Sequence, residues 1–242
     1  MKTFSITDAG AIREMNQDFY FSSDTAVGNL PNLFIVADGM GGHKAGDYAS
    51  RYTIERVVAS VSRNAGDEPV SIIKEAINKA NELLLAESRQ DEAKRGMGTT
   101  LVIGTIIGNK LFVANIGDSR LYIVGGTEQI RQITRDHSLV DEMVRMGEIN
   151  ADEARVHPDK NIITRAVGAA DHVEADFFEV ELSEDDRILL CTDGLTNMVR
   201  DEEICDTIRQ NDNIETAASQ LVAMANANGG RDNITVMIIK PF

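Results

Sequence analysis

Five aspartates stand at the ends of short apolar runs in this sequence, where their carboxylates could meet in one site. Asp38, Asp118 and Asp193 follow the runs LFIVA, LFVANIG and RILLCT. Asp18 and Asp232 stand just before the runs FYFS and ITVMII. Carboxylates that are brought together repel one another unless a cation neutralises them. Oxygen-only ligands favour Mg²⁺ or Mn²⁺, so the pattern indicates a divalent-metal centre.

Taken singly, each of these aspartates has a simpler explanation. Asp-Gly is common turn chemistry, and aspartate often caps a helix that follows a strand. Three Asp-Gly or Gly-Asp units at strand ends, with Arg-Asp-Asn before another strand, weaken that explanation for the group. Zinc is the poorer choice of metal, because the histidines show no HxxxH-like spacing. The histidines are His43, His137, His157 and His172.

The carboxylates can meet only if the strands that carry them run antiparallel. In a parallel sheet, aspartates that follow strands and aspartates that precede strands would lie at opposite edges. Gly108-Asn109 between two strand-like runs predicts a two-residue hairpin and therefore antiparallel pairing. The expected strands are Phe4–Thr7, Phe19–Ser22, Leu33–Ala37, Thr100–Ile107, Leu111–Ile116, Leu121–Val124, Gln129–Ile133, Phe177–Val180, Arg187–Cys191 and Ile234–Ile239.

Two kinds of apolar pattern predict how these strands are covered. Thr100–Ile107 is apolar almost throughout, so we expect both of its faces to be buried. Helical stripes begin at Ile54, Val70 and Ala217, and Gly229-Gly230 stops the last of these helices. Two antiparallel sheets packed together, with helices outside, satisfy both patterns. Since no linker or low-complexity tract is visible, we expect residues 1–242 to form a single domain.

The composition is that of a soluble globular protein. The chain has 242 residues, of which 43% are hydrophobic and 26% charged, and neither cysteine belongs to a CxxC pair. The opening MKTFSITDAG becomes polar too early for a signal peptide, and no window approaches the ~20 apolar residues of a membrane span. The net charge of −15 disfavours nucleic acid and anionic membranes as partners. We therefore expect a cytoplasmic protein with no nucleic-acid or membrane partner.

Several known classes of phosphate-binding or phosphate-transferring proteins can be excluded, because their sequence motifs are missing here. The glycine-rich GMGGHKAG does not match the P-loop pattern GxxxxGK[ST]. A cysteine phosphatase needs arginine six residues after its nucleophile, where Cys191 and Cys205 have Asn197 and Asn211. An aspartyl nucleophile of the DxDx[TV] type fails as well, because Val36 and Cys191 stand two residues before the Asp-Gly pairs. Metal-activated water remains as the nucleophile.

Eight motifs, in this order, resemble the PPM, or type 2C, metal-dependent serine/threonine phosphatases in their compact bacterial form. They are TDAGAIREMNQD (7–18), VADGMGGHKAGDYAS (36–50), GMGTTL (96–101), IGDSRLY (116–122), TRDHSLV (134–140), NIITRAVG (161–168), CTDGLTN (191–197) and GGRDNITV (229–236). They span nearly the whole chain, so the resemblance is specific. It implies an α+β fold, a four-layer α-β-β-α sandwich of two antiparallel sheets flanked by helices.

The resemblance also implies how the metals are held. Asp38 is similar to the carboxylate that bridges two metal ions, and the backbone carbonyl of Gly39 would complete the shell of one of them. Asp193 and Asp232 resemble the ligands of the other ion. Asp118 together with Asp193 resembles a weaker third-metal site. The implied cofactors are therefore two Mn²⁺ or Mg²⁺ ions, with a weaker third.

Two further residues match catalytic positions outside the metal shells. Asp18 resembles a group that holds metal-bound water. Arg13 matches the position that binds the substrate phosphate, a task that suits guanidinium because it is always charged and offers two donors to phosphate oxygens. The implied reaction is in-line attack of a metal-activated water on phosphorus, without a phosphoenzyme.

The chain departs from the family's pattern at two positions. Met40 stands where some members carry a histidine proposed to protonate the leaving group, so we assign the general acid to no side chain and interpret His43 as structural. Gln17 replaces an acidic residue common in the first motif, which leaves the charge around the ligands open. Residues 137–168 are expected to form a flap subdomain beside the site, with an ordinary helical crossover as the alternative.

We therefore expect a monomeric, metal-dependent phosphoserine and phosphothreonine protein phosphatase. Its expected partners are the phosphoproteins made by a bacterial serine/threonine kinase, an expectation that rests on family analogy alone. A phosphoprotein-binding pseudophosphatase is one alternative, and the presence of Asp38, Gly39, Asp193 and Asp232 argues against it. Hydrolysis of small phosphate esters is another alternative, which the same residues would support equally well.

Overall fold

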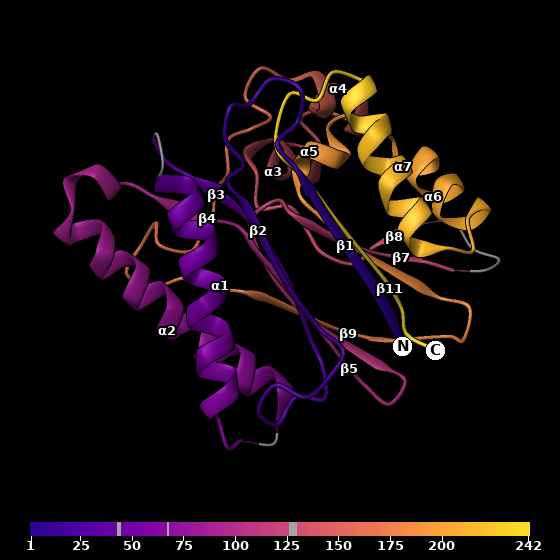
Figure 1. Ribbon diagram of the computed structural model, residues 1–242. Coiled ribbons are helices and arrows are strands. Elements are labelled where there is room, and N and C mark those ends of the chain that lie inside the picture. Colours follow the sequence, from indigo (N-terminus) through magenta and orange to yellow (C-terminus); the bar gives the residue numbers. More distant parts are fainter. Residues whose placement is uncertain (43–44, 67, 126–129) are drawn as a thin grey trace.

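The backbone forms two antiparallel sheets that pack face to face (Figure 1). The computed structural model describes residues 1–42, 45–66, 68–125 and 130–242. One sheet has the strand order β1-β11-β10-β7-β8, and the other has the order β2-β3-β5-β6-β9, with β4 paired to β3. The strands are β1 (Lys2–Asp8), β2 (Asp18–Ser23), β3 (Leu33–Met40), β4 (Gly98–Thr99), β5 (Leu101–Ile107), β6 (Lys110–Ile116), β7 (Arg120–Val124), β8 (Arg131–Gln132), β9 (Asp176–Glu181), β10 (Arg187–Cys191) and β11 (Ile234–Lys240).

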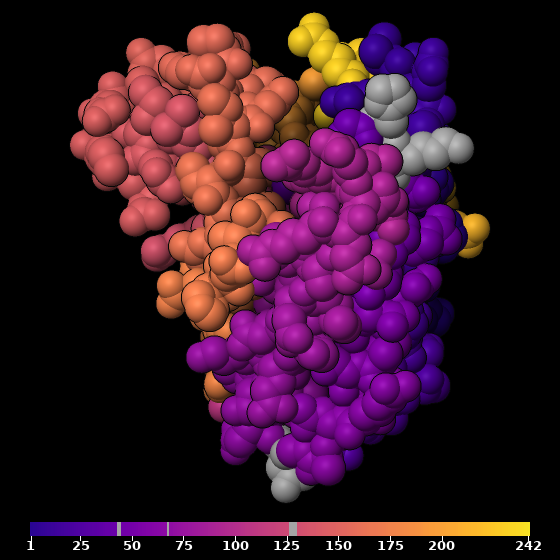
Figure 2. All heavy atoms as spheres, turned by 90° about the vertical axis from the view of Figure 1, so that its left-hand side faces the viewer, coloured from indigo at the N-terminus to yellow at the C-terminus, as the bar shows by residue number. Residues whose placement is uncertain are grey.

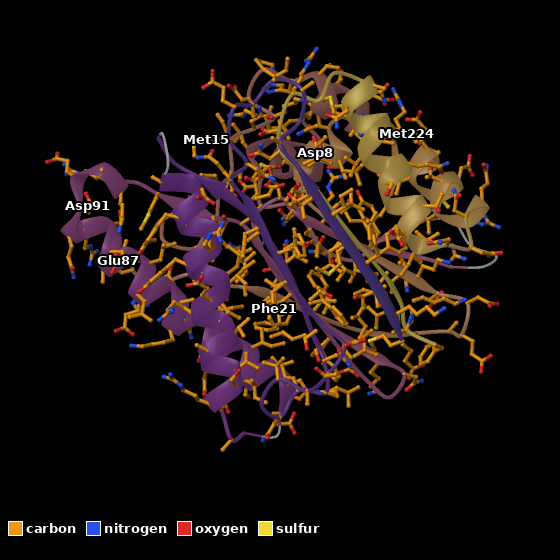
Figure 3. All side chains as sticks on the ribbon, in the orientation of Figure 1. Asp8, Met15, Phe21, Glu87, Asp91 and Met224 are labelled. Atoms are coloured by element: carbon orange, nitrogen blue, oxygen red, sulfur yellow. The ribbon has the colours of Figure 1, made fainter. Side chains whose placement is uncertain are left out.

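Helices cover the outer face of each sheet. Helices α1 and α2 lie over the β2–β9 sheet, and α6 and α7 lie over the β1–β8 sheet (Figure 1). Two side chains labelled in Figure 3 mark these outer layers: Phe21 packs into the cluster under α1 and α2, and Met224 packs into the cluster under α6 and α7. The expected four-layer α-β-β-α sandwich is thus confirmed. The helices are α1 (Ala45–Arg63), α2 (Pro69–Gln90), α3 (Leu139–Met146), α4 (Ala151–Val156), α5 (Asp193–Thr196), α6 (Asp201–Gln210) and α7 (Ile214–Ala227), with a 3₁₀ turn, η1 (Glu92–Lys94).

Strand β5 shows why the layers hold together. Its side chains alternate in direction, so Leu101 and Ile103 enter the cluster beneath α1 and α2, whereas Val102 and Ile106 enter the cluster between the sheets. Full burial of such a side chain contributes roughly 1.5–3 kcal/mol. The continuous apolar run therefore reflects a central strand that is covered on both sides, as predicted.

The predicted elements correspond to observed ones, with local differences. The hairpin at Gly108 is confirmed, because Ile107 pairs with Lys110 across a two-residue turn. Val70 was expected in the buried stripe of α2 but is 37% exposed. The helix begins at Pro69, and its buried face runs through Pro69, Ile72 and later positions, which leaves Val70 at the margin. Of the expected strand 129–133, only residues 131–132 pair as β8, and Gln129 and Gly126 lie outside the described residues.

The first and last strands pair along their whole length. Strand β1 runs antiparallel to β11 from Lys2 opposite Lys240 to Asp8 opposite Ile234, so the two ends of the chain lie side by side (Figure 1). Both cysteines are free and buried. Within the described ranges, none of the helices has the length and apolar character needed to cross a bilayer.

Candidate metal centre

The structure brings the five aspartates to one end of the two sheets. In the β2–β9 sheet, Asp18 stands opposite Asp38 on neighbouring strands. The Oδ2 atom of Asp18 also accepts hydrogen bonds from Thr192 Oγ1 (2.9 Å) and Thr235 Oγ1 (2.7 Å). Thr192 directly follows β10 and Thr235 lies in β11, both in the other sheet, so Asp18 connects the two sheets at this edge. The antiparallel strand polarity is what permits this convergence.

Asp38 is held through its backbone. Its amide nitrogen donates to Thr100 Oγ1 (2.8 Å), and its carbonyl accepts from Thr99 Oγ1 (2.7 Å) and Thr100 N (2.9 Å). The sequence placed the end of this strand at Ala37, but β3 continues to Met40 because β4 pairs with Gly39 and Met40. Asp38 therefore projects from regular strand rather than from a loop.

Gly39 permits a close approach between β3 and the start of α1. A Cβ atom on Gly39 would lie 2.0 Å from the carbonyl oxygen of Gly46 and 2.7 Å from that of Gln17. Both obstacles are backbone atoms, which no side-chain rotation can clear. The Gly39 amide also donates to the Gln17 carbonyl (3.1 Å), which ties the metal-site strand to the segment before Asp18.

Asp193 and Asp118 stand in tight connections that follow strands. Asp193 is the first residue of α5, and its Oδ2 accepts from Asn197 Nδ2 (2.8 Å) one turn later. Asp118 lies in the turn between β6 and β7. The preceding residue, Gly117, donates its amide to His137 Nδ1 (3.0 Å), which connects this turn to residues 137–168.

Arg13 and Asp232 form the exposed rim of the site. Arg13 Nη2 lies 2.9 Å from Asp232 Oδ2, and the side chains are 51% and 32% exposed. Arg13 lies in the loop between β1 and β2, which Asp8 and Met15 bracket in Figure 3. The loop therefore holds a cationic guanidinium at the solvent side of a buried carboxylate cluster.

Asn233, which was assigned no role from the sequence, fastens that loop. Its Nδ2 donates to the carbonyls of Ala9 and Met15 (both 2.9 Å), and its Oδ1 accepts from Gln17 N (2.8 Å). Asn233 is buried and follows Asp232 directly. One amide side chain thus sets the position of the Arg13 loop relative to the metal-site strand.

Burial and mutual repulsion act on the carboxylates of the cluster, and a bound cation would relieve both. Burial raises the pKa of Asp18 to about 7 and that of Asp193 to about 6, and repulsion from Asp232 adds to both. Burial and repulsion by neighbouring aspartates hold the pKa values of Asp38 and Asp118 well above their usual range. The side chain of Asp38 partly opposes this rise in the pKa of Asp193.

Three carboxylate oxygens in the cluster lack a partner. The Oδ1 atoms of Asp18, Asp118 and Asp193 are buried and find no hydrogen-bond partner among the described residues. Nearly all buried polar atoms in proteins are hydrogen-bonded or coordinated, so these three fit a bound cation. In the described part of the chain, no group of three or more His, Cys, Asp or Glu side chains is arranged so that these side chains alone could hold a metal ion. Mg²⁺ sites typically use one or two carboxylates and keep several waters, which matches an open, hydrated centre.

The sequence did not identify the supporting hydroxyls. Thr192 and Thr235 bind one carboxylate oxygen of Asp18, and the other oxygen is buried without a hydrogen-bond partner among the described residues. Both lie inside motifs that the sequence highlighted: Thr192 directly precedes Asp193, and Thr235 is two residues after Asn233. The alternation of β11 could have suggested an inward Thr235, but only the packing of the two sheets shows that it reaches Asp18.

Residues 137–168 lie beside this edge. They contain α3 and α4 and form the rose to salmon lobe at the upper left of Figure 2. The lobe is tied to the body by a bridge between Thr99 and Val167. Met40, at the end of β3, offers no titratable group. His43, which was interpreted as structural, lies outside the described residues.

Comparison with known proteins agrees with this geometry. A family profile described as Protein phosphatase 2C matches residues 11–234. The serine/threonine phosphatase stp of Listeria welshimeri is 40% identical over 244 residues, covering 97% of this chain and 93% of that protein. The crystal structure of serine/threonine phosphatase Stp1 from Staphylococcus aureus has a TM-score of 0.91 at 33% identity, covering 98% of this chain and 93% of that one.

A further solved structure carries metal. The catalytic domain of serine threonine protein phosphatase PstP, in complex with two manganese ions, has a TM-score of 0.85 at 32% identity and covers 98% of this chain and 96% of that one. The likenesses extend over almost the full length of each protein. The chain therefore belongs to the protein phosphatase 2C family of metal-dependent serine/threonine protein phosphatases.

Proposed function

We propose that this chain removes phosphate from phosphoserine and phosphothreonine in proteins at a two-metal centre held by Asp38, Gly39, Asp193 and Asp232. The observation that carries the proposal is the set of buried carboxylates with unpartnered oxygens at the meeting edge of the sheets. The manganese complex of the PstP domain supports two ions of the same kind. Asp118 together with Asp193 would hold a weaker third ion.

The residues around the metals have separate tasks. When bound, the ions supply an acidified water as nucleophile and neutralise the charge of the phosphate. Asp18, with Oδ2 fixed by two threonine hydroxyls, keeps Oδ1 free to accept a proton and to orient that water. The carbonyl of Gly39 would add a neutral oxygen ligand, which would limit the number of charges that repel one another.

Arg13 is the residue proposed to bind the substrate phosphate. Its Nη2 contacts Asp232 and its Nε points to the Arg231 carbonyl (3.4 Å), while Nη1 has no partner among the described residues. A guanidinium anchored on two sides keeps its remaining donors in a fixed direction, which suits a tetrahedral anion. The exposed position of Arg13 places this grip at the entrance of the site.

We further propose that residues 137–168 act as a flap beside the site within one catalytic domain of 242 residues. The tie between Gly117 and His137 supports this, because it couples the segment to the turn that carries Asp118. We place the enzyme in the cytoplasm as a monomer that opposes a bacterial serine/threonine kinase, by analogy with the family.

The deciding experiment is phosphate release from a phosphothreonine peptide with Mn²⁺ and with chelator. Release with Mn²⁺ and none with chelator is expected. Release that survives chelation would refute the metal mechanism, and binding of the peptide without release would identify a pseudophosphatase. Parallel assays with p-nitrophenyl phosphate test the small-ester alternative, which a much higher kcat/KM on that compound would favour.

A further inference from the structure

A basic groove opens next to the carboxylate cluster in this otherwise acidic protein. It has a volume of about 610 Å³. Its cationic side chains come from two distant parts of the chain: the proposed flap provides Arg155 and Lys160, and the opposite wall provides Arg200 and Arg231. With a net charge of −15, four cations around one groove contrast with the rest of the surface.

Three of these cations lack a carboxylate partner among the described residues. Arg155 Nη2 donates to the carbonyl of Thr196 (3.2 Å), and Lys160 Nζ donates to Asn197 Oδ1 (3.0 Å). The Arg231 side chain makes no hydrogen bond or ion pair with the described residues. Asp152 also lines the groove, but it forms no ion pair with these three side chains, and an anion in the groove would offset their mutual repulsion.

The pKa of Lys160 reflects electrostatic repulsion among the cations. Burial lowers the pKa of Lys160, and the nearby charges of Arg155 and Arg231 lower it further, while Asp193 acts in the opposite direction. Arg200 differs from the other three, because it lies 3.8 Å from Asp152 in a largely exposed pair. Such a pair contributes little and leaves Arg200 able to exchange partners.

The groove continues into the metal centre. A second cavity of about 380 Å³ is lined by Asp118 and Asp193 and shares Arg155, Lys160 and Arg200 with the groove. A substrate polypeptide whose phosphate lies at the proposed metal centre can therefore extend along the basic groove. No aromatic ring lines the groove within the described residues, so stacking with nucleic-acid bases has no platform.

We propose that this groove binds a negatively charged residue that flanks the phosphorylated serine or threonine of the protein substrate, and so gives the enzyme a preference for acidic or doubly phosphorylated sites. The proposal rests on the proposed phosphatase function. Arg231 is the most informative residue, because its side chain has no hydrogen bond or ion pair to lose among the described residues. Arg155 and Lys160 also join the flap to α5, so their replacement has structural effects as well.

The test compares three phosphothreonine peptides that differ only in their flanks: neutral, glutamate-rich, and carrying a second phosphothreonine. The enzyme is the full chain with Mn²⁺, as wild type, Arg231→Gln and Arg155→Gln. Lys74→Gln serves as a charge-matched control on the exposed face of α2. The measurement is the ratio of kcat/KM for each charged peptide to that for the neutral one.

Wild type and Lys74→Gln should show a ratio of roughly five, the effect of about 1 kcal/mol from exposed charge pairs. Arg231→Gln should bring the ratio towards one, and so should salt at about 1 M, where the Debye length is about 3 Å. A wild-type ratio of one, or an Arg231→Gln enzyme that keeps the full ratio, overturns the groove proposal. A purely structural role for Arg155 would lower kcat/KM equally for all peptides. Failure to hydrolyse any peptide refutes the proposed phosphatase function instead.

Discussion

Replacement of Asp18 by asparagine should make the metal-free protein more stable at neutral and alkaline pH while it impairs catalysis. The asparagine side chain has the shape of aspartate, and its carbonyl oxygen can still accept the hydroxyls of Thr192 and Thr235. Its amide group would face the neighbouring carboxylates as a donor, where wild type places a second acceptor without a partner. The substitution therefore removes a charge and keeps the packing.

The magnitude follows from the pKa of Asp18. Burial, followed by repulsion from Asp193 and Asp232, raises it from 3.8 to about 7, although two threonine hydrogen bonds oppose the change. A carboxyl with a raised pKa in the folded state stabilises the fold below its unfolded pKa and loses that contribution as the pH rises through about 7. Between pH 5 and pH 8 the free energy of unfolding of wild type falls by about 2–3 kcal/mol for this reason. The asparagine variant does not undergo this loss, because its side chain does not titrate.

The assay is urea denaturation of both proteins in chelator at pH 5 and pH 8. The free energy of unfolding of Asp18→Asn, relative to wild type, should rise by about 2–3 kcal/mol between these pH values. Mn²⁺ should stabilise wild type more than the variant, and phosphate release should fall roughly 10–100-fold in the variant. A relative stability that does not change with pH would refute the assigned burial and repulsion at Asp18.

Three further outcomes test the other parts of the site. Asp193→Ala should lose phosphate release and the Mn²⁺-induced rise in Tm together, and retention of either would separate Asp193 from the metals. Arg13→Ala should chiefly raise KM for a phosphopeptide and lower kcat/KM roughly 10–100-fold, because it loses a charged hydrogen bond to phosphate; unchanged steady-state kinetics would exclude the phosphate role. Gly39→Ala should destabilise the fold by at least about 1–3 kcal/mol, since its Cβ meets backbone 2.0 Å away. Gly42→Ala, where the new Cβ would meet no atom of the described residues within 4 Å, is the control for thermal melting, and equal Tm values for the two variants would contradict that reasoning.

The layers and the meeting point of the aspartates could be predicted because both follow from local patterns. The unbroken apolar run of β5 indicates two buried faces, and Gly108-Asn109 indicates a hairpin, so antiparallel polarity was accessible from the sequence. Once the polarity is known, aspartates on either side of a strand must converge. The candidate aspartate ligands could therefore be proposed without knowledge of any side-chain contact.

The features that could not be predicted from the sequence depend on contacts between distant segments. Thr235 reaches Asp18 across 217 positions, and Asn233 holds the loop of Met15 across 218. No spacing rule covers such distances. Strand β4 was missed because two residues, Gly98 and Thr99, carry no periodicity, although their pairing extends β3 past Asp38. The basic groove has the same origin, since Arg155 and Arg231 become neighbours only in the folded chain.

The pairing of β11 between β1 and β10 has a consequence for biosynthesis. Translation delivers Arg13 and Asp18 early, but the strand that separates β1 from β10 and the carboxylate of Asp232 emerge only when residues 232–240 have left the ribosome. Until then the first sheet lacks its inner strand and the Arg13 loop lacks its Asn233 anchor. A nascent chain that stops before residue 232 therefore lacks both a proposed metal ligand and the side chain that anchors the Arg13 loop.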